Sequence, residues 1–128
     1  MKNKILLILS FLFASSLIQG AAFPDISVKD LQEAISSKKV AVIDVNGPRS
    51  FSNGHIPGAI EFSTQKKDLE SLLPKNKDTL VVAYCGGPSC RAYLRGANAA
   101  AKLGYTNVRH LSAGISGWKK SGQKVDKK

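Results

Sequence analysis

The sequence predicts an α/β domain with a mainly parallel central sheet flanked by helices. Short runs of β-branched and apolar residues alternate along the chain with segments of helical periodicity. These apolar runs are nearly continuous, which is typical of strands covered on both faces, as in a parallel sheet. The 128 residues, 43% hydrophobic and 22% charged, suffice for one such domain and exclude collagen-like, mucin-like and largely disordered chains.

Residues 1–22 read as a secretory signal peptide. Lys2 and Lys4 precede an apolar run from Ile5 to Ala14, and small residues occupy positions 20–22. The apolar run is shorter than the roughly 20 residues that span a bilayer. We therefore expect cleavage near positions 20–22, a periplasmic or secreted protein, and no stable membrane insertion after cleavage.

The first half of the domain, which we expect to span residues 23–122, provides a helix, two strands and a further helical turn. Ser27, with an acidic residue three positions later, resembles a capping box ahead of apolar residues at helical spacing. Residues 40–45 form a β-branched run and predict a strand. Pro48 suits the first turn of a short helical segment, and residues 59–62 predict a second strand after a glycine-containing turn.

The second half repeats the alternation of helices and strands. Residues 67–73 place three leucines on one helical face before a proline, and residues 79–84 predict a buried strand. Residues 91–103 predict an alanine-rich helix, which ends because a glycine follows it. Residues 107–111 predict one more strand and residues 115–118 a closing helix.

The chain is strongly basic, and the excess is concentrated at its C-terminus. The net charge is +10. Removal of the predicted signal peptide takes away Lys2 and Lys4, and half of the remaining positive charge lies between Lys119 and Lys128. We expect residues 123–128 to form a basic, solvated and frayed tail, because a terminal lysine run seldom packs. We expect no nucleic-acid partner for an exported protein, whereas small anions or an acidic or redox partner protein would be attracted.

The loop that follows the strand over residues 79–84 is the expected site. In open α/β sheets ligands bind beyond the carboxyl ends of the strands, where Cys85 begins the loop. The two glycines after Cys85 permit a tight turn whose NH groups point toward one centre. Pro88 has no NH, so the donors of this ring would be the backbone amides of Gly86, Gly87, Ser89, Cys90 and Arg91.

Such a ring would stabilise a Cys85 thiolate and lower its pKa below the ~8.5 of a free thiol. Arg91 and Arg95 lie near the predicted helix start, where a cation is unfavourable by roughly 0.3–1 kcal/mol. Their presence indicates an anion to be neutralised. The plainer alternatives are that both arginines face solvent and that Cys85 is a small buried apolar residue.

Several motifs, in order, resemble those of the rhodanese-like domain family. The resemblance implies an α/β fold of about five strands, in which Cys85 accepts a sulfane sulfur as a persulfide that a thiophilic acceptor then removes. We expect thiosulfate or polysulfide donors and thiol acceptors, and no cofactor. The motifs are Asp44-Val45, Gly54-His55-Ile56-Pro57-Gly58-Ala59, Tyr84-Cys85, Leu103-Gly104-Tyr105-Thr106-Asn107-Val108 and Ser112-Ala113-Gly114-Ile115-Ser116-Gly117-Trp118.

Two departures from the family pattern bear on the substrate. The loop from Cys85 to Arg91 has seven residues, which matches the related phosphatase and arsenate-reductase branch, whereas sulfurtransferases commonly have six. Asn46 stands where the family usually has arginine. A rhodanese-type sulfurtransferase is therefore the first prediction, with a phosphatase or arsenate-reductase-like enzyme and a non-catalytic sulfur-delivery module as alternatives.

Cys90 admits three interpretations. It could resolve a persulfide on Cys85, releasing sulfide and leaving a disulfide. It could form a permanent disulfide with Cys85, as export would permit. It could also point into the core at the helix start and remain unreactive.

Three further side chains are candidates for supporting roles around the loop. Asp44 ends a buried strand, so it should face donors and act as a brace rather than as an acid. His55 is expected to order its turn by hydrogen bonding rather than to act as a base. Arg95 is the third candidate for a supporting role near the loop. Two histidines and two cysteines provide no ligand set for a closed structural zinc site, and no metal is expected.

Overall fold

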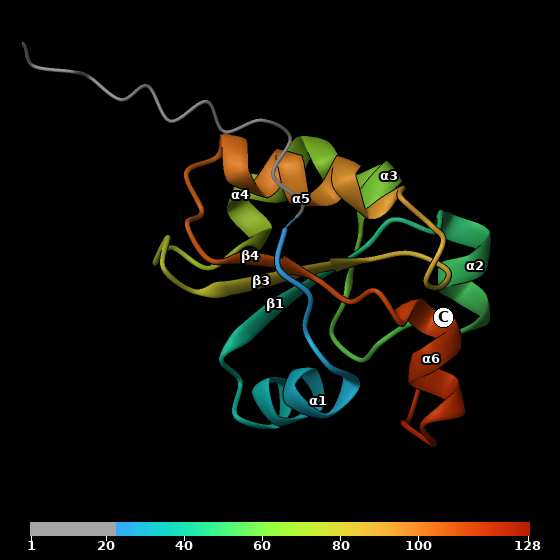
Figure 1. Ribbon diagram of the computed structural model, residues 1–128. Helices are drawn as coiled ribbons and strands as arrows, with labels where there is room; N and C mark the ends of the chain where they lie inside the picture. The colour runs from blue at the N-terminus through green and yellow to red at the C-terminus, as the bar shows by residue number, and fades with distance from the viewer. Residues whose placement is uncertain (1–22) are drawn as a thin grey trace, which may run out of the picture.

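The computed structural model describes residues 23–128, which form a parallel sheet between two layers of helices (Figure 1). The predicted signal peptide, residues 1–22, lies outside the described residues. No helix between residues 23 and 128 is both long and apolar enough to cross a bilayer. The sheet order is β2-β1-β3-β4, with bounds β1 Val40–Asp44, β2 Ile60–Glu61, β3 Leu80–Tyr84 and β4 Val108–His110.

Within residues 23–128 the sheet has four strands, so the expectation of about five is wrong. The position of a fifth strand, beside β4, is taken by an isolated parallel bridge between Asp25 and His110. The backbone NH of His110 donates to the Pro24 carbonyl over 3.0 Å, and that of Ile26 donates to the His110 carbonyl over 2.9 Å. This pairing stays short because Pro24 has no NH and Ser27 already caps the first helix.

Helices cover both faces of the sheet. Figure 1 shows α3, α4 and α5 above it, α1 below it, and α2 and α6 beyond the carboxyl ends of the strands. The alternation along β3 separates two cores, since Val81 and Ala83 face the α5 side while Val82 and Tyr84 face the α1 side. The helices are α1 Val28–Ser36, α2 Pro48–Asn53, α3 Phe62–Gln65, the 3-10 turn η1 Lys66–Asp68, α4 Leu69–Leu72, α5 Tyr93–Lys102 and α6 Gly114–Lys120.

The second predicted strand is shorter than expected because Glu61 starts a helix. Its side-chain oxygens accept hydrogen bonds from the backbone NH groups of Ser63, over 3.1 Å, and Thr64, over 2.9 Å. This is an N-terminal cap, so Phe62 is helical although it was expected to extend the strand. The helix predicted over residues 67–73 is divided between η1 and α4.

The C-terminal segment, residues 123–128, is docked, so the expectation of a frayed tail is wrong. His55 and Asp126 exchange two backbone hydrogen bonds, each 2.9 Å long. The indole NH of Trp118 donates to the Lys124 carbonyl over 2.9 Å, and Val125 packs against the α1-side core. The lysines of this segment are exposed, because the backbone and one apolar side chain make the contacts while the charges remain in water.

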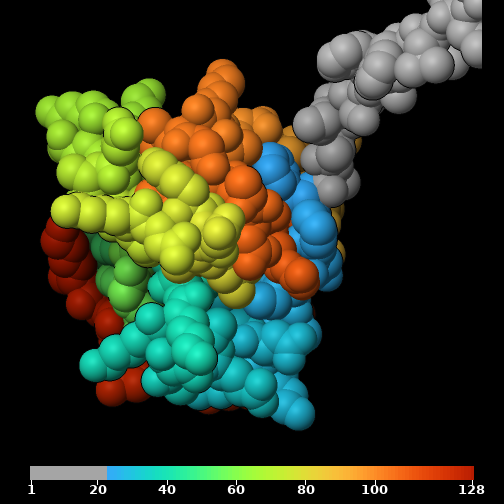
Figure 2. All heavy atoms as spheres, turned by 90° about the vertical axis from the view of Figure 1, so that its left-hand side faces the viewer, coloured from blue at the N-terminus to red at the C-terminus, as the bar shows by residue number. Residues whose placement is uncertain are grey.

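The end of the sheet opposite Cys85 is formed by the segments that lead into β1, β3 and β4. Figure 2 shows this face, with those three segments in teal, yellow and orange. Since the strands are parallel, they all run from this face toward α2 and α6 (Figure 1). The carboxyl ends, where the reactive loop was predicted, therefore gather on the far side.

Candidate functional site

Cys85 directly follows β3, and the loop after it leads to α5. The start of α6 holds this loop from one side. The backbone NH of Ile115 donates to the Cys85 carbonyl, and that of Ser116 donates to the Gly86 carbonyl, each over 3.0 Å. Two successive loop carbonyls are therefore fixed by a segment about thirty residues further along the chain.

Gly114 permits this close approach. Its φ is +61°, and a Cβ placed on it would lie 2.5 Å from the Gly87 nitrogen and 2.7 Å from the Gly86 oxygen. Only glycine fits a position with that backbone conformation and that distance. Sequence reasoning treated Gly114 only as part of a family motif. The signal available in the sequence was a glycine just before the closing helix.

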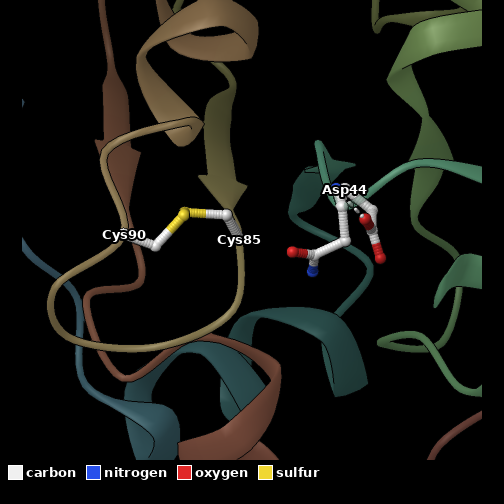
Figure 3. The surroundings of a disulfide bond; sticks show 4 residues. Asp44, Cys85 and Cys90 are labelled. Atoms are coloured by element: carbon white, nitrogen blue, oxygen red, sulfur yellow. Dashed lines mark hydrogen bonds between the residues drawn. A yellow bond between two sulfur atoms is a disulfide. The ribbon is translucent and has the colours of Figure 1, made fainter.

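Cys85 and Cys90 form a disulfide across the loop, with 6.2 Å between their Cα atoms (Figure 3). Cys85 is only 3% exposed, whereas Cys90 is half-buried between two exposed residues. The interpretation in which Cys90 points into the core at the helix start and remains unreactive is therefore wrong. The two interpretations that involve a disulfide, a resolving thiol and a permanent bridge, both agree with this geometry.

The loop amides are largely uncommitted. Within residues 23–128, the NH of Cys90 donates to the Gly87 carbonyl over 3.0 Å. By contrast, no hydrogen bond to another described protein atom is made by the NH groups of Gly86, Gly87, Ser89 and Arg91. Four of the five donors of the predicted ring thus have no acceptor among residues 23–128. In the disulfide the Cys85 sulfur carries no charge, so the ring around a thiolate stays a prediction for the reduced protein.

The two arginines lie on the outer side of the loop. Arg91 is exposed and precedes α5 rather than lying in its first turn, whereas Arg95 is exposed within that turn. The helix predicted from residue 91 begins at Tyr93. Pro88 and Ser89 are also exposed, so the stretch from Pro88 to Arg91 forms the outer rim of the site.

Asp44, at the end of β1, is 1% exposed and accepts two hydrogen bonds. The Asn46 NH donates to it over 2.7 Å and the Tyr84 hydroxyl over 2.5 Å, while the same hydroxyl accepts from the Ile56 NH over 3.0 Å. Burial raises the pKa of Asp44 although these hydrogen bonds oppose the change. Burial and the neighbouring carboxylate also raise the pKa of Tyr84. Figure 3 shows the Asp44 carboxylate directed away from the disulfide, and its hydrogen bond from the Tyr84 hydroxyl joins the ends of β1 and β3.

His55 is committed to its own turn. The ring stacks on Phe51 with 3.6 Å between centroids, and Nδ1 is 2.7 Å from the Phe51 carbonyl oxygen. Its backbone holds Asp126 through two hydrogen bonds. Because the ring is 8% exposed and hydrogen-bonded locally, its contacts order the turn and the C-terminal segment.

Two polar side chains border the glycine pair of the loop: Asn46, noted in the sequence only as a departure from the family pattern, and Ser116, noted only as part of a motif. Asn46 Oδ1 lies 3.9 Å from the position of a Cβ on Gly86, and Ser116 Oγ lies 3.9 Å from that on Gly87. They come from the segment after β1 and from α6, so only the fold brings them together. Neither side chain carries a charge, which leaves Arg91 as the cation closest along the chain to Cys90.

The pattern that defines the rhodanese-like domain matches residues 27–121. The chain belongs to the rhodanese-like domain family. The thiosulfate sulfurtransferase GlpE of Shewanella oneidensis is 30% identical over 101 residues, covering 77% of this chain and 94% of that protein. Arsenate reductase 2.1 of Oryza sativa subsp. japonica is 33% identical over 112 residues, covering 77% and 68% respectively.

Solved structures give the same fold for this rhodanese-like domain. The human single-domain sulfurtransferase TSTD1 superposes with a TM-score of 0.61 at 24% identity, covering 76% of this chain and 96% of that chain. At that identity the likeness concerns the fold. The predicted α/β fold with a parallel sheet flanked by helices is confirmed.

Proposed function

We propose that this rhodanese-like domain is a sulfurtransferase in which Cys85 carries a sulfane sulfur taken from thiosulfate or a polysulfide. The observation that carries the proposal is the position of Cys85 at the carboxyl end of β3, enclosed by a loop whose amides at Gly86, Gly87, Ser89 and Arg91 are uncommitted. The similarity to a named thiosulfate sulfurtransferase over 94% of its length adds support.

The first step begins from the reduced protein. The Cys85 thiolate attacks the outer sulfur of thiosulfate, the sulfur–sulfur bond of thiosulfate breaks, and sulfite leaves with the bonding pair. The product is a persulfide anion on Cys85. Backbone NH groups and the positive end of α5 favour negative charge at this point, both before and after transfer. Arg91, exposed at the rim, attracts the anionic donor.

Cys90 provides the second step. The Cys90 thiol gives its proton to the outer sulfur of the persulfide and its sulfur attacks Cys85 Sγ. The bond to the outer sulfur breaks, and hydrosulfide leaves with the electron pair. The product is the Cys85–Cys90 disulfide, the state that the structure contains. An external thiol acceptor can instead take the outer sulfur before Cys90 reacts. Two external thiols return the two electrons that reopen the disulfide.

Intact-mass spectrometry of the reduced protein after exposure to thiosulfate tests the proposal. The Cys90→Ser variant should gain one sulfur atom, which cyanide removes as thiocyanate. The wild type should release sulfide and lose two hydrogens as its disulfide closes. The Cys85→Ser variant is the matched control and should gain nothing. Failure of Cys90→Ser to gain sulfur from either thiosulfate or polysulfide would refute the proposal.

A second candidate, an arsenate reductase or phosphatase, is favoured by the seven-residue loop and by the 33% identity to an arsenate reductase. One residue more in the loop widens it toward a tetrahedral oxyanion. Cys85-dependent arsenate reduction or phosphate-ester hydrolysis, without sulfur transfer, would establish this candidate. A non-catalytic sulfur-delivery module would be indicated if Cys85→Ser retained the full biological effect.

The export of the mature protein to the periplasm or the exterior belongs to the same proposal. The basic and apolar pattern of residues 1–22 supports it. Fractionation of cells and N-terminal sequencing of the mature chain test it, with cleavage expected near positions 20–22. A full-length cytoplasmic product would contradict it.

A further inference from the structure

We infer that Cys90 is the sulfur at which an external thiol reductant enters the site, and that Cys85 is the thiolate which this attack releases. The inference rests on the proposed function, in which the Cys85–Cys90 disulfide must be reopened before Cys85 can accept sulfur again. Either sulfur of a disulfide can be attacked, and access, the leaving thiolate and local charge decide between them. All three favour Cys90 here.

Access distinguishes the two sulfurs first. Cys85 is 3% exposed and lies at the end of β3, with its carbonyl fixed by the NH of Ile115. Cys90 is half-buried, and Ser89 and Arg91 on either side of it are exposed. A thiolate arriving from solvent therefore meets the outer rim of the loop, where Cys90 lies, before it can reach Cys85.

The leaving group distinguishes them a second time. Exchange is faster when the departing thiolate is better stabilised. Cys85 opens the loop whose amides at Gly86, Gly87, Ser89 and Arg91 have no acceptor among the described residues. If these donors form the ring predicted for the reduced protein, attack on Cys90 expels the Cys85 thiolate at the centre of that ring. The opposite attack would expel Cys90, which stands at the far end of the loop.

The charge beside Cys90 agrees with this direction. The reacting form of a reductant is an anionic thiolate. Arg91, the next residue along the chain, is exposed and borders the rim, so it attracts that anion toward Cys90. The neighbours of the glycine pair on the other side, Asn46 and Ser116, are uncharged.

The exchange balances with two external thiols. The first thiolate attacks Cys90 Sγ, its sulfur bonds to Cys90, and the Cys85–Cys90 bond breaks with its electron pair going to Cys85. The second thiolate attacks the external sulfur of that mixed disulfide and expels the Cys90 thiolate. The thiols are oxidised to their disulfide and the protein gains two electrons. While the mixed disulfide lasts, Cys90 is blocked and Cys85 is free to load sulfur without losing it to Cys90.

Glutathione serves as the probe on the mature, disulfide-bonded protein. Brief exposure, acid quenching and alkylation of the freed thiol, followed by peptide fragmentation between positions 85 and 90, locate both groups. The chain has two cysteines, so the assignment is unambiguous. We expect glutathione on Cys90 and the alkyl group on Cys85 in at least a tenfold excess over the reverse. A majority of glutathione on Cys85, or an even distribution, would overturn the inference.

Arginine variants supply a second measurement. Arg91→Gln should slow the capture of glutathione severalfold at low salt, and by a larger factor than Arg95→Gln, which removes the same charge one turn away. Equal slowing by the two variants would overturn the guiding role of Arg91. Sulfur loading of Cys90→Ser does not depend on which sulfur a reductant attacks. A failed mapping experiment therefore refutes this inference alone, and failed loading refutes the proposed function.

Discussion

Replacing Gly114 with alanine should destabilise the protein and displace the reactive loop. Gly114 has a φ of +61°, and its missing Cβ leaves room for the Gly86-Gly87 backbone, whose nearest atoms would lie 2.5–2.7 Å from that Cβ. Real carbon atoms do not approach backbone this closely. The alanine must therefore push the loop away from α6, and both elements are fixed at the contact.

The expected loss of stability has two parts. A residue other than glycine in the left-handed region costs roughly 1–2 kcal/mol. Moving the loop also weakens the hydrogen bonds from Ile115 to Cys85 and from Ser116 to Gly86, each worth about 1 kcal/mol net. The free energy of unfolding should fall by about 3–4 kcal/mol in Gly114→Ala.

Gly122→Ala is the matched control, since its φ is +76° but nothing lies within 4 Å of a Cβ built there. It should lose only the backbone contribution of about 1–2 kcal/mol. Urea unfolding of both oxidised variants at neutral pH measures the difference. Equal losses would refute the steric argument. Sulfur loading of Gly114→Ala, tested in the Cys90→Ser background, should slow in parallel because the carbonyl of Cys85 loses its anchor.

Three further predictions concern the buried polar groups and the C-terminal segment. Tyr84→Phe should lower the free energy of unfolding by about 2–4 kcal/mol at pH 7, because the buried Asp44 carboxylate and the Ile56 NH lose their partner. The pKa of Asp44 rises further without the hydroxyl, so this loss of stability should shrink on acidification. A loss that stays constant from pH 7 to pH 4 would contradict the argument. Burial opposes ionisation of Glu61, but hydrogen bonds from its capping partners lower its pKa below 4.5. Glu61→Gln should therefore lower the free energy of unfolding by about 1 kcal/mol at neutral pH. The difference in stability from the wild type should vanish as the pH falls below 4.5 and through the lowered pKa of Glu61, because the wild-type carboxylate is then protonated. Deleting residues 123–128 should lower the free energy of unfolding by about 2–3 kcal/mol, because the hydrogen bonds to His55 and to the Trp118 indole are lost. Replacing the exposed lysines of this segment by alanine should change stability by less than about 0.5 kcal/mol. Urea unfolding that is unaffected by the deletion would disprove the docking.

The order of the elements could be predicted from local patterns. Val40–Asp44 and Leu80–Tyr84 are continuous apolar runs, and such runs are stable only when both faces are covered. The strand count could not be predicted as well, because the pairing of Asp25 with His110 depends on a neighbour 85 residues away and on the missing NH of Pro24. The docking of residues 123–128 escaped prediction for the same reason, since the lysines of that segment indicate solvent and its contacts are made by backbone.

The family, the parallel α/β architecture and the position of Cys85 after a buried strand were predictable from the sequence alone, because these depend on residue type and spacing. The partners of the loop, by contrast, depend on how distant segments pack. Gly114, Ile115 and Ser116 reach it from α6, and Asn46 reaches it from beyond β1. The fold also brings the Cys90 side chain from the rim to the buried Cys85, because the direction of a side chain within a turn depends on the backbone that packs against it.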